Sequence, residues 1–186
     1  MAQRYVLVSI LALLVAGACH ADPVDSSVSF ETRASFDTVR SHMLDAGILE
    51  KLSPGTVTVT GVEKIADTAE TLTYRASEEW KPLDLPFVSI APTKLEVTYS
   101  VDRRSLDARA IVVTFDVAPD ASRSGDWKHL SGRLLAVDLR DGSTFVRIEG
   151  HSDSTSGLLP EAIRQKVAAH YLGKARERIE AWLQAL

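Results

Sequence analysis

The final segment of the chain, Pro160 to Leu186, constrains the fold more than any other segment. Its apolar residues recur at steps of four, with a single step of three, which places them on one stripe of an α-helix. At about 1.5 Å per residue, this helix would be about 40 Å long. A one-sided helix of that length needs an equally long apolar surface, so earlier segments must supply one. The stripe consists of Ile163, Val167, Tyr171, Ala175, Ile179, Trp182 and Leu186.

Seven earlier segments have the composition of β-strands, and we expect them to form that surface. Most alternate apolar with polar residues, which is the period of a half-buried strand. In the segment that ends at Leu139, we expect Leu135, Val137 and Leu139 to face the interior. Asp141-Gly142 is the strongest hairpin signal, because Gly readily adopts the positive φ of a tight turn. The predicted strands are Ser27–Ala34, Thr56–Ile65, Thr71–Trp80, Thr93–Asp102, Arg109–Val117, Trp127–Leu139 and Thr144–Gly150.

Two short helices are predicted between the first and second strands. Ser35 is a candidate N-cap for the first helix, and Asp37 follows in its first turn. Gly47 should end this helix, and Ile48–Leu52 would form a second small helix or turn before Pro54. The apolar stripe of the first helix is Phe36, Val39, Met43 and Leu44.

The N-terminus has the pattern of an export signal. A cationic start at Arg4 precedes an apolar run and small residues that end at Ala21. Cleavage after Ala21 would leave a mature domain of residues 22–186, either periplasmic or secreted. In an alternative interpretation, the chain is a lipoprotein whose only cysteine, Cys19, becomes the acylated first residue. In both cases, the mature chain has no internal disulfide.

Size and charge set further bounds. Residues 22–186 make one domain of ordinary size, with enough chain for a sizeable core. Loss of residues 1–21 lowers the count of Lys and Arg from 21 to 20 and leaves 25 Asp and Glu. A mildly acidic domain without basic clusters is a poor match for nucleic acid, so we exclude that partner.

The order of elements is similar to the helix-grip fold of the START-like (SRPBCC) superfamily, which includes polyketide cyclases and coenzyme Q-binding proteins. Ala34 to Gly55 resembles the opening of this fold, in which a strand leads into two short helices and a proline-glycine turn. Ser131 to Pro160 resembles its ending, with the hairpin before the final helix. The resemblance covers the whole mature chain in layout but only its two ends in motif. It implies an α+β fold, in which a curved antiparallel sheet of about seven strands wraps around the long C-terminal helix.

Such a fold leaves space between helix and sheet, and we expect several side chains to line it. Small residues near the middle of the helix, such as Gly173, either pack closely on the sheet or widen a cavity. Arg109 either reaches solvent from its strand end or pairs with a ligand carboxylate or phosphate. A cavity of this kind would favour a lipid, isoprenoid, sterol or polyketide. The candidate ligand-binding residues are Tyr74, Tyr99, Arg109, Val113, Phe115, His170 and Gly173.

The segment Lys81 to Pro92 contains three prolines, so it cannot be a regular central strand. We interpret it as a long loop at the pocket entrance. Its apolar residues Leu85, Phe87 and Ile90 would fold onto the core, cover the pocket as a lid, or contact a membrane or an envelope protein.

Residues for catalysis are scarce. No two histidines after residue 21 have the close spacing of a metal-binding motif. Ser152 and Asp153 follow His151, but the chain lacks the sharp turn that a hydrolytic nucleophile needs. We therefore assign no catalytic residue, no metal and no cofactor.

These features favour an exported START-like protein that binds or carries a hydrophobic small molecule in an internal cavity. In one alternative, the same pocket belongs to an enzyme of the cyclase or isomerase type, where a histidine or an acid moves a proton. In another, the chain is an envelope accessory protein that acts by protein–protein contact, and side chains fill its cavity.

Overall fold

The computed structural model of the protein describes residues 23–44, 57–81, 83–85, 88–90, 93–117, 129–153 and 160–186. The predicted export signal and the predicted helix at 48–52 lie outside these residues. The elements are β1 (Val24–Thr32), α2 (Phe36–Met43), β2 (Val57–Asp67), β3 (Thr71–Trp80), β4 (Leu83–Leu85), β5 (Val88–Ile90), β6 (Thr93–Asp102), the 3-10 helix η1 (Arg103–Ala108), β7 (Ala110–Val117), β8 (His129–Asp138), β9 (Thr144–Asp153) and α4 (Glu161–Gln184).

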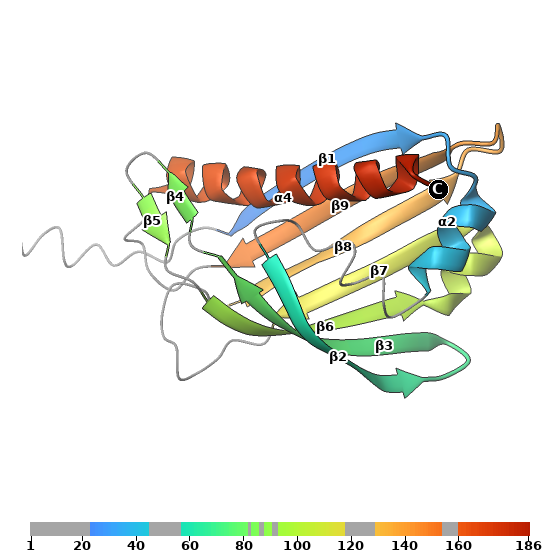
Figure 1. The fold of residues 1–186 in the computed structure, drawn as a ribbon, viewed down its shortest axis with the longest axis horizontal. Helices are drawn as coiled ribbons and strands as arrows, with labels where there is room; N and C mark the ends of the chain where they lie inside the picture. Colours follow the sequence, from blue (N-terminus) through green and yellow to red (C-terminus); the bar gives the residue numbers. More distant parts are fainter. Residues whose placement is uncertain are drawn as a thin grey trace, which may run out of the picture.

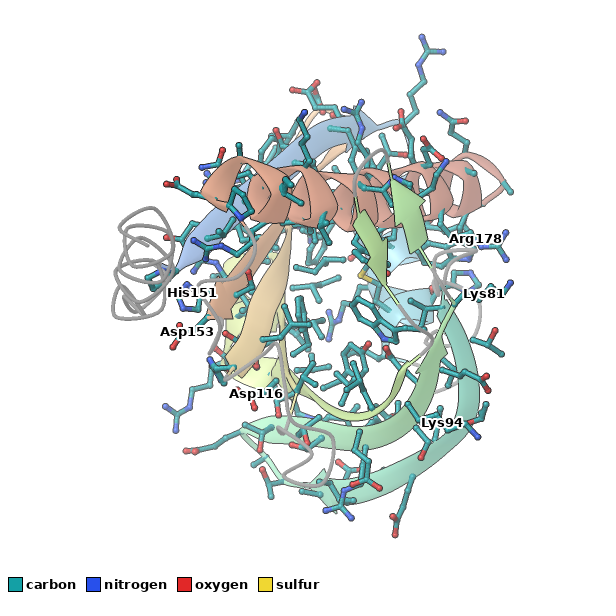
Figure 2. The ribbon with its side chains drawn as sticks, turned by 90° about the vertical axis from the view of Figure 1, so that its left-hand side faces the viewer. Lys81, Lys94, Asp116, His151, Asp153 and Arg178 are labelled. Carbon is teal, nitrogen blue, oxygen red and sulfur yellow. The ribbon has the colours of Figure 1, made fainter. Side chains whose placement is uncertain are left out.

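Seven strands form one sheet in the order β1-β9-β8-β7-β6-β3-β2. Every neighbouring pair in it is antiparallel. Figure 1 shows α4 lying across this sheet, with α2 near the C-terminal end of α4. Figure 2 shows the molecule from the end opposite α2, where the strands curve beneath α4. The predicted α+β helix-grip arrangement is confirmed.

Local sequence accounts for the start of the fold. In β1, Val24, Phe30 and Thr32 are buried while the residues between them are more exposed, as the period of two requires. The chain then turns, and the Ser35 side chain accepts a hydrogen bond from the backbone N–H of Thr38 at 3.3 Å. This N-cap begins α2 where the sequence predicts it. The helix buries Phe36, Val39 and Met43.

The sequence-based prediction for β8 is wrong about which face is buried. Ala136 is fully buried and Leu134 packs against the core, whereas Leu139 is 39% exposed. The pairing of β8 with β9 fixes this register, because Ala136 lies opposite the buried Val146. Alternate side chains of a strand point to opposite faces, so Leu135 and Val137 lie on the outer face. Both faces of β8 carry apolar residues, so alternation alone does not show which face is buried.

The apolar stripe of α4 is wider than predicted. Val167 and Ile179 are buried as expected, but so are Leu172 and Leu183, which the predicted stripe omits. Leu186 is exposed. A curved sheet contacts a broad arc of the helix, which adds positions next to the ideal stripe.

The connections also differ from expectation. The turn predicted after β6 is the 3-10 helix η1, capped by the Asp102 side chain, which accepts from the backbone N–H of Arg104 at 2.9 Å. Arg109 ends η1 with a left-handed backbone (φ 52°) and precedes β7 rather than belonging to it. In the segment predicted as a loop, β4 and β5 pair as a separate two-stranded sheet.

The main core lies toward the end of the sheet that α2 covers. There, buried side chains of the sheet, α2 and the C-terminal half of α4 form one continuous cluster. Its members are Phe30, Phe36, Val39, Met43, Ile111, Ala136, Val146, Ile148, Leu172, Ile179 and Leu183. A second, smaller cluster consists of Leu72, Tyr74 and Val101.

Candidate ligand-binding cavity

A cavity of about 230 Å³ lies between α4 and the concave face of the sheet. Strands β3, β6, β7, β8 and β9 supply most of one wall, and α4 supplies the other through residues between Val167 and Ile179. Almost all of the lining is apolar. For scale, an apolar cavity of about 150 Å³ can take up benzene, so this cavity has room for a larger ring system or a short alkyl chain.

Two facing glycines help to shape the cavity. Gly132 of β8 lies opposite Gly150 of β9 and opposite Phe115 of β7. A Cβ on Gly132 would overlap both the backbone oxygen of Glu149 and the Phe115 ring, so only Gly fits there. The ring of Phe115 can therefore lie over bare backbone. A Cβ on Gly150 would meet Leu172 of α4 at 3.7 Å, which is ordinary contact.

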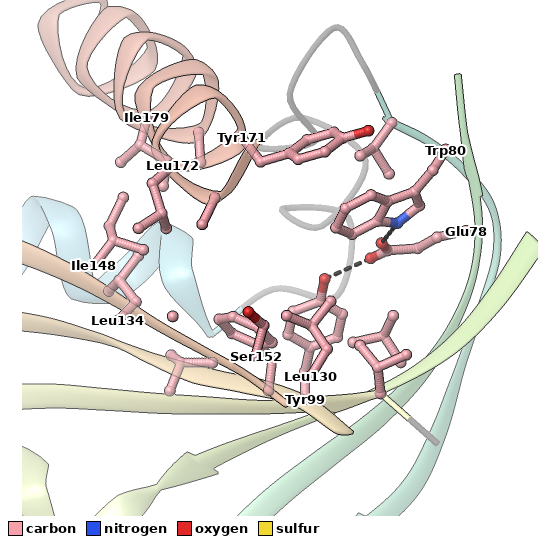
Figure 3. A pocket seen from close by; sticks show the side chains of 18 of the residues that line it. Glu78, Trp80, Tyr99, Leu130, Leu134, Ile148, Ser152, Tyr171, Leu172 and Ile179 are labelled. Atoms are coloured by element: carbon pink, nitrogen blue, oxygen red, sulfur yellow. Dashed lines mark hydrogen bonds between the residues drawn. The ribbon is translucent and has the colours of Figure 1, made fainter. Parts of the chain in front are cut away.

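One polar cluster interrupts the apolar lining. Glu78 of β3 is only 5% exposed, and each of its carboxyl oxygens accepts a hydrogen bond. The Tyr99 hydroxyl donates to Oε1 at 2.5 Å, and the Trp80 ring N–H donates to Oε2 at 2.9 Å. The ring of Tyr171, on α4, lies 4.7 Å from that of Trp80 between centroids. Figure 3 shows this group of side chains around one part of the cavity.

Burial dominates the electrostatics of this cluster. Removal from water raises the pKa of Glu78, although the hydrogen bonds from Tyr99 and Trp80 act in the opposite direction. Burial, together with the negative charge of Glu78, raises the pKa of Tyr99 well above its usual value. Burial also raises the pKa of Tyr171. The lining residues that the structure describes include no Lys, Arg or His, so Glu78 faces no protein cation there.

Four of the predicted ligand-binding residues come together in this cavity. Tyr74, Tyr99, Val113 and Phe115 all line it. The Tyr74 hydroxyl is engaged, because it donates to the backbone oxygen of Leu44 at 3.3 Å. Tyr99 therefore supplies the hydroxyl that belongs to the polar cluster.

Three other predicted residues lie outside the lining. Arg109 forms ion pairs with Asp138 and, at 3.5 Å, with Asp37, and its guanidinium lies over the Phe36 ring. It therefore braces the junction of α2 with the end of η1. Arg109 does not face the cavity because its left-handed backbone at the end of η1 removes it from the alternating pattern of β7.

His170 and Gly173 are the other two, and neither lines the cavity. The ring of His170 packs edge-on against Tyr171, with 5.8 Å between centroids. A Cβ added to Gly173 would meet no atom within 4 Å, so close packing does not require a glycine there.

Glu78 is the main feature that the sequence-based list omitted. It lies in phase with Leu72, Tyr74 and Ala76 along β3, all of which are buried. The period of two therefore places Glu78 inside, and extending the pattern by one step would have found it. A carboxyl in that phase is the signal of a special site, because buried acids are rare.

The remaining candidates stay as predictions. The entrance role of Leu85, Phe87 and Ile90 is not tested, because Phe87 and the side chains of the other two lie outside the described part of the chain. Within the described residues, no group of three or more His, Cys, Asp or Glu could hold a metal ion. No helix among them combines the length and the apolar character needed to cross a membrane.

Comparison with known proteins identifies the fold. No protein-family model matches the sequence, and no curated protein matches it. Among solved structures, a STAR-related lipid transfer protein from Xanthomonas axonopodis is 13% identical, with a TM-score of 0.59 over 86% of this chain and 85% of that one. The Zhui aromatase/cyclase from Streptomyces is also 13% identical, with a TM-score of 0.58 over 88% and 93%. Norcoclaurine synthase from Thalictrum flavum is 12% identical, with a TM-score of 0.54 over 87% of both chains. The chain thus has the START-like fold.

Proposed function

We propose that the protein binds or carries a hydrophobic small molecule in the cavity beneath α4. The observation that carries this proposal is a nearly apolar cavity of about 230 Å³ with a single polar cluster in its wall. Concave, mostly apolar sites with a few placed polar groups are the usual form of small-molecule sites. The names of the structural neighbours, a lipid transfer protein and an aromatase/cyclase, support the same class of ligand.

Export is part of this proposal and rests on the N-terminal sequence pattern alone. A carrier of this kind would take its ligand up in the periplasm or outside the cell. Contact with a membrane or an envelope protein, through the segment that includes β4 and β5, would let it load or deliver that ligand.

The direct test is native mass spectrometry of protein purified gently from its own host, followed by organic extraction. A single lipid-like mass at near-stoichiometric occupancy is the expected result. Protein that is empty, and that also binds none of a panel of lipids, isoprenoids and small aromatic hydrocarbons, would overturn the proposal.

Two neighbouring alanines of α4 offer a matched control for the location of the site. Ala168 lines the cavity, whereas Ala169 is exposed. Ala168→Trp should fill the cavity and abolish binding, while Ala169→Trp should leave binding unchanged. Arg109→Gln should also leave binding unchanged, because Arg109 lies outside the lining.

One observation favours a second candidate, an enzyme of the cyclase or isomerase type. Glu78 is a buried acid in a cleft, its pKa is raised by burial, and it shares a hydrogen bond with Tyr99. Such groups are candidates for proton transfer. In an enzyme, Glu78→Gln should abolish turnover while ligand still binds; in a carrier, no turnover of any bound ligand should be found in the unmodified protein.

A further inference from the structure

Within the described part of the chain, two hydrogen bonds leave Glu78 with acceptor capacity to spare. A carboxylate has about four lone-pair sites, two on each oxygen. The described structure fills one on Oε1 with the Tyr99 hydroxyl and one on Oε2 with the Trp80 ring N–H. Both donors are neutral, and the described lining of the cavity contains no Lys, Arg or His. Among the residues that the structure describes, the carboxyl is therefore held in place by neutral donors alone.

A cation that enters this cavity would find an anion that has already lost its water. Burying an ion pair is often unfavourable, because both ions must give up their hydration. Here folding has removed water from Glu78, so binding has to remove it only from the cation. The remaining hydration cost is about half of what a pair buried in one step would carry, and a charge-assisted hydrogen bond offsets it.

The aromatic side chains beside Glu78 favour the same kind of ligand. The rings of Trp80 and Tyr171 are tilted by 50° with centroids 4.7 Å apart, and Tyr99 completes the polar cluster. Aromatic faces carry negative charge density and attract a cation within about 6 Å of the centroid, Trp most strongly. Apart from Tyr74 and Ser152, the rest of the lining is apolar and would take the body of the ligand.

We propose that the cavity selects apolar molecules that carry a single protonated amine, and that Glu78 and its aromatic neighbours bind this amine. The inference rests on the proposed function, since it names the ligand class of the same site. Glu78 is thereby the residue that determines specificity, and the apolar lining supplies most of the contact area. A cavity of about 230 Å³ fits a molecule of the size of a substituted bicyclic aromatic.

The test uses four probes of the same shape: 1-methylnaphthalene, 1-naphthalenemethanol, 1-naphthylmethylamine and 1-naphthoate. Their binding to the mature protein is measured by their fluorescence and by calorimetry. We expect the amine to bind roughly tenfold or more tightly than the methyl and alcohol compounds, as one charge-assisted hydrogen bond would give. The carboxylate should bind most weakly, because it would place a second negative charge beside Glu78.

Two variants from the same strand provide the control. Glu78→Gln keeps the size of the side chain and removes its charge, so the preference for the amine should disappear while 1-methylnaphthalene still binds. Glu79 occupies the next position of β3 and points to the other face of the sheet. Glu79→Gln removes the same charge from that face and should leave all four affinities unchanged.

A pH series on the unmodified protein keeps the test valid if Glu78→Gln does not fold. Glu78 is the only described lining residue that titrates in the acid range, since the other ionisable ones are tyrosines. The preference for the amine over the methyl compound should therefore fade as the pH drops through the raised pKa of Glu78.

The outcomes separate the inference from the proposed function. If 1-methylnaphthalene binds but the amine binds no better than it, the inference is wrong and the hydrophobic cavity function stands. If the alcohol binds best, Glu78 recognises a neutral donor and the amine class is again wrong. If none of the four probes binds, the inference fails, and the lipid and isoprenoid panel then decides whether the proposed function fails with it.

Discussion

The two ends of α4 lie over different interiors. Toward its C-terminus, Leu183 is only 2% exposed and belongs to a continuous cluster with Phe36, Val39 and Ile111. From Val167 to Ile179 the helix also borders the cavity, and Tyr171 reaches the polar cluster around Glu78. One amphipathic helix thus closes a packed core at one end and a hollow at the other.

The charged groups near the two ends of α4 differ in the partners that the protein gives them. Near the packed end, Arg109 has fixed protein partners in Asp138 and Asp37. At the hollow end, the described donors to Glu78 are both neutral. The packed end completes its interactions within the protein, whereas the hollow end leaves contact surface and acceptor capacity for another molecule. Stability and ligand binding are therefore expected to respond to substitutions at different ends.

The largest contrast should come from two leucines of α4. Leu183→Ala should cost about 2–5 kcal/mol of unfolding free energy, because it leaves a void in a packed cluster. Leu172 belongs to the same cluster but also borders the cavity, so Leu172→Ala should cost less, because part of this side chain already faces empty space. Urea denaturation of both variants measures the difference. Equal losses would show that the two ends are packed alike.

The second largest contrast in stability is expected between the facing glycines, Gly132 and Gly150. Gly132→Ala should cost about 1–3 kcal/mol, because its Cβ would overlap the backbone of Glu149 and the ring of Phe115. Gly150→Ala should barely change stability, since its Cβ only reaches contact distance with Leu172. It should instead reduce the cavity and weaken binding of 1-methylnaphthalene. A stable Gly132→Ala protein would contradict the close approach of Phe115.

The two ends should also respond to pH with opposite signs. Burial raises the pKa of Glu78 above its usual value of 4.5, so the stability linked to its proton is fully present below that value and is lost as pH rises through the raised pKa. The pKa of Asp138 is lowered below its usual value of 3.8. The main cause is a hydrogen bond from the backbone of Arg140, and the next is a hydrogen bond from the side chain of Arg109. The stability that the charged Asp138 contributes is present above pH 3.8 and is lost as the pH falls through the lowered pKa.

Thermal unfolding across the acid to neutral range tests this pair. Glu78→Gln should flatten the loss of stability toward neutral pH, whereas Asp138→Asn should flatten the loss in acid. If Glu78→Gln left the neutral limb unchanged, Glu78 would not titrate as a buried acid.

The smallest effect is expected at Gly173, between the two ends. Gly173→Ala should raise stability by up to about 1 kcal/mol, because Ala has the higher helix propensity and its methyl group meets open space. Ligand affinity should not change. A loss of binding, measured with the same naphthalene probes, would restore the pocket role that the sequence pattern indicated for this residue.

The sequence predicted the arrangement of the elements better than it predicted the site. Strands with a single apolar face, such as β6 and β9, have an unambiguous period of two, and their buried residues follow it. The N-cap at Ser35 depends on adjacent residues only, so it too was predictable. In β8 both faces are apolar, and only its pairing with β9 determines which one is buried.

The site depended on information that alternation alone does not contain. The alternating pattern of β7, extended back to Arg109, predicts that this residue faces the cavity. The left-handed backbone at Arg109 breaks that pattern, so β7 begins at Ala110. Glu78 was passed over because a charge is ordinarily expected in water, although its phase in β3 placed it inside. The contact of Tyr99 with Glu78 joins residues on different strands, so the pattern of one strand could not predict it.

The order of strands in the sheet has a consequence for how the chain folds. β1 is the first strand in the sequence, but its partner β9 lies more than a hundred residues later. The hairpins from β2 to β9 can pair as soon as they are made, whereas β1 must wait for a distant partner, and such long-range closure is slow. Because α4 packs mainly against β1 and β9, we expect the helix to dock after that step. The cavity would then form last, when the two ends of the domain meet.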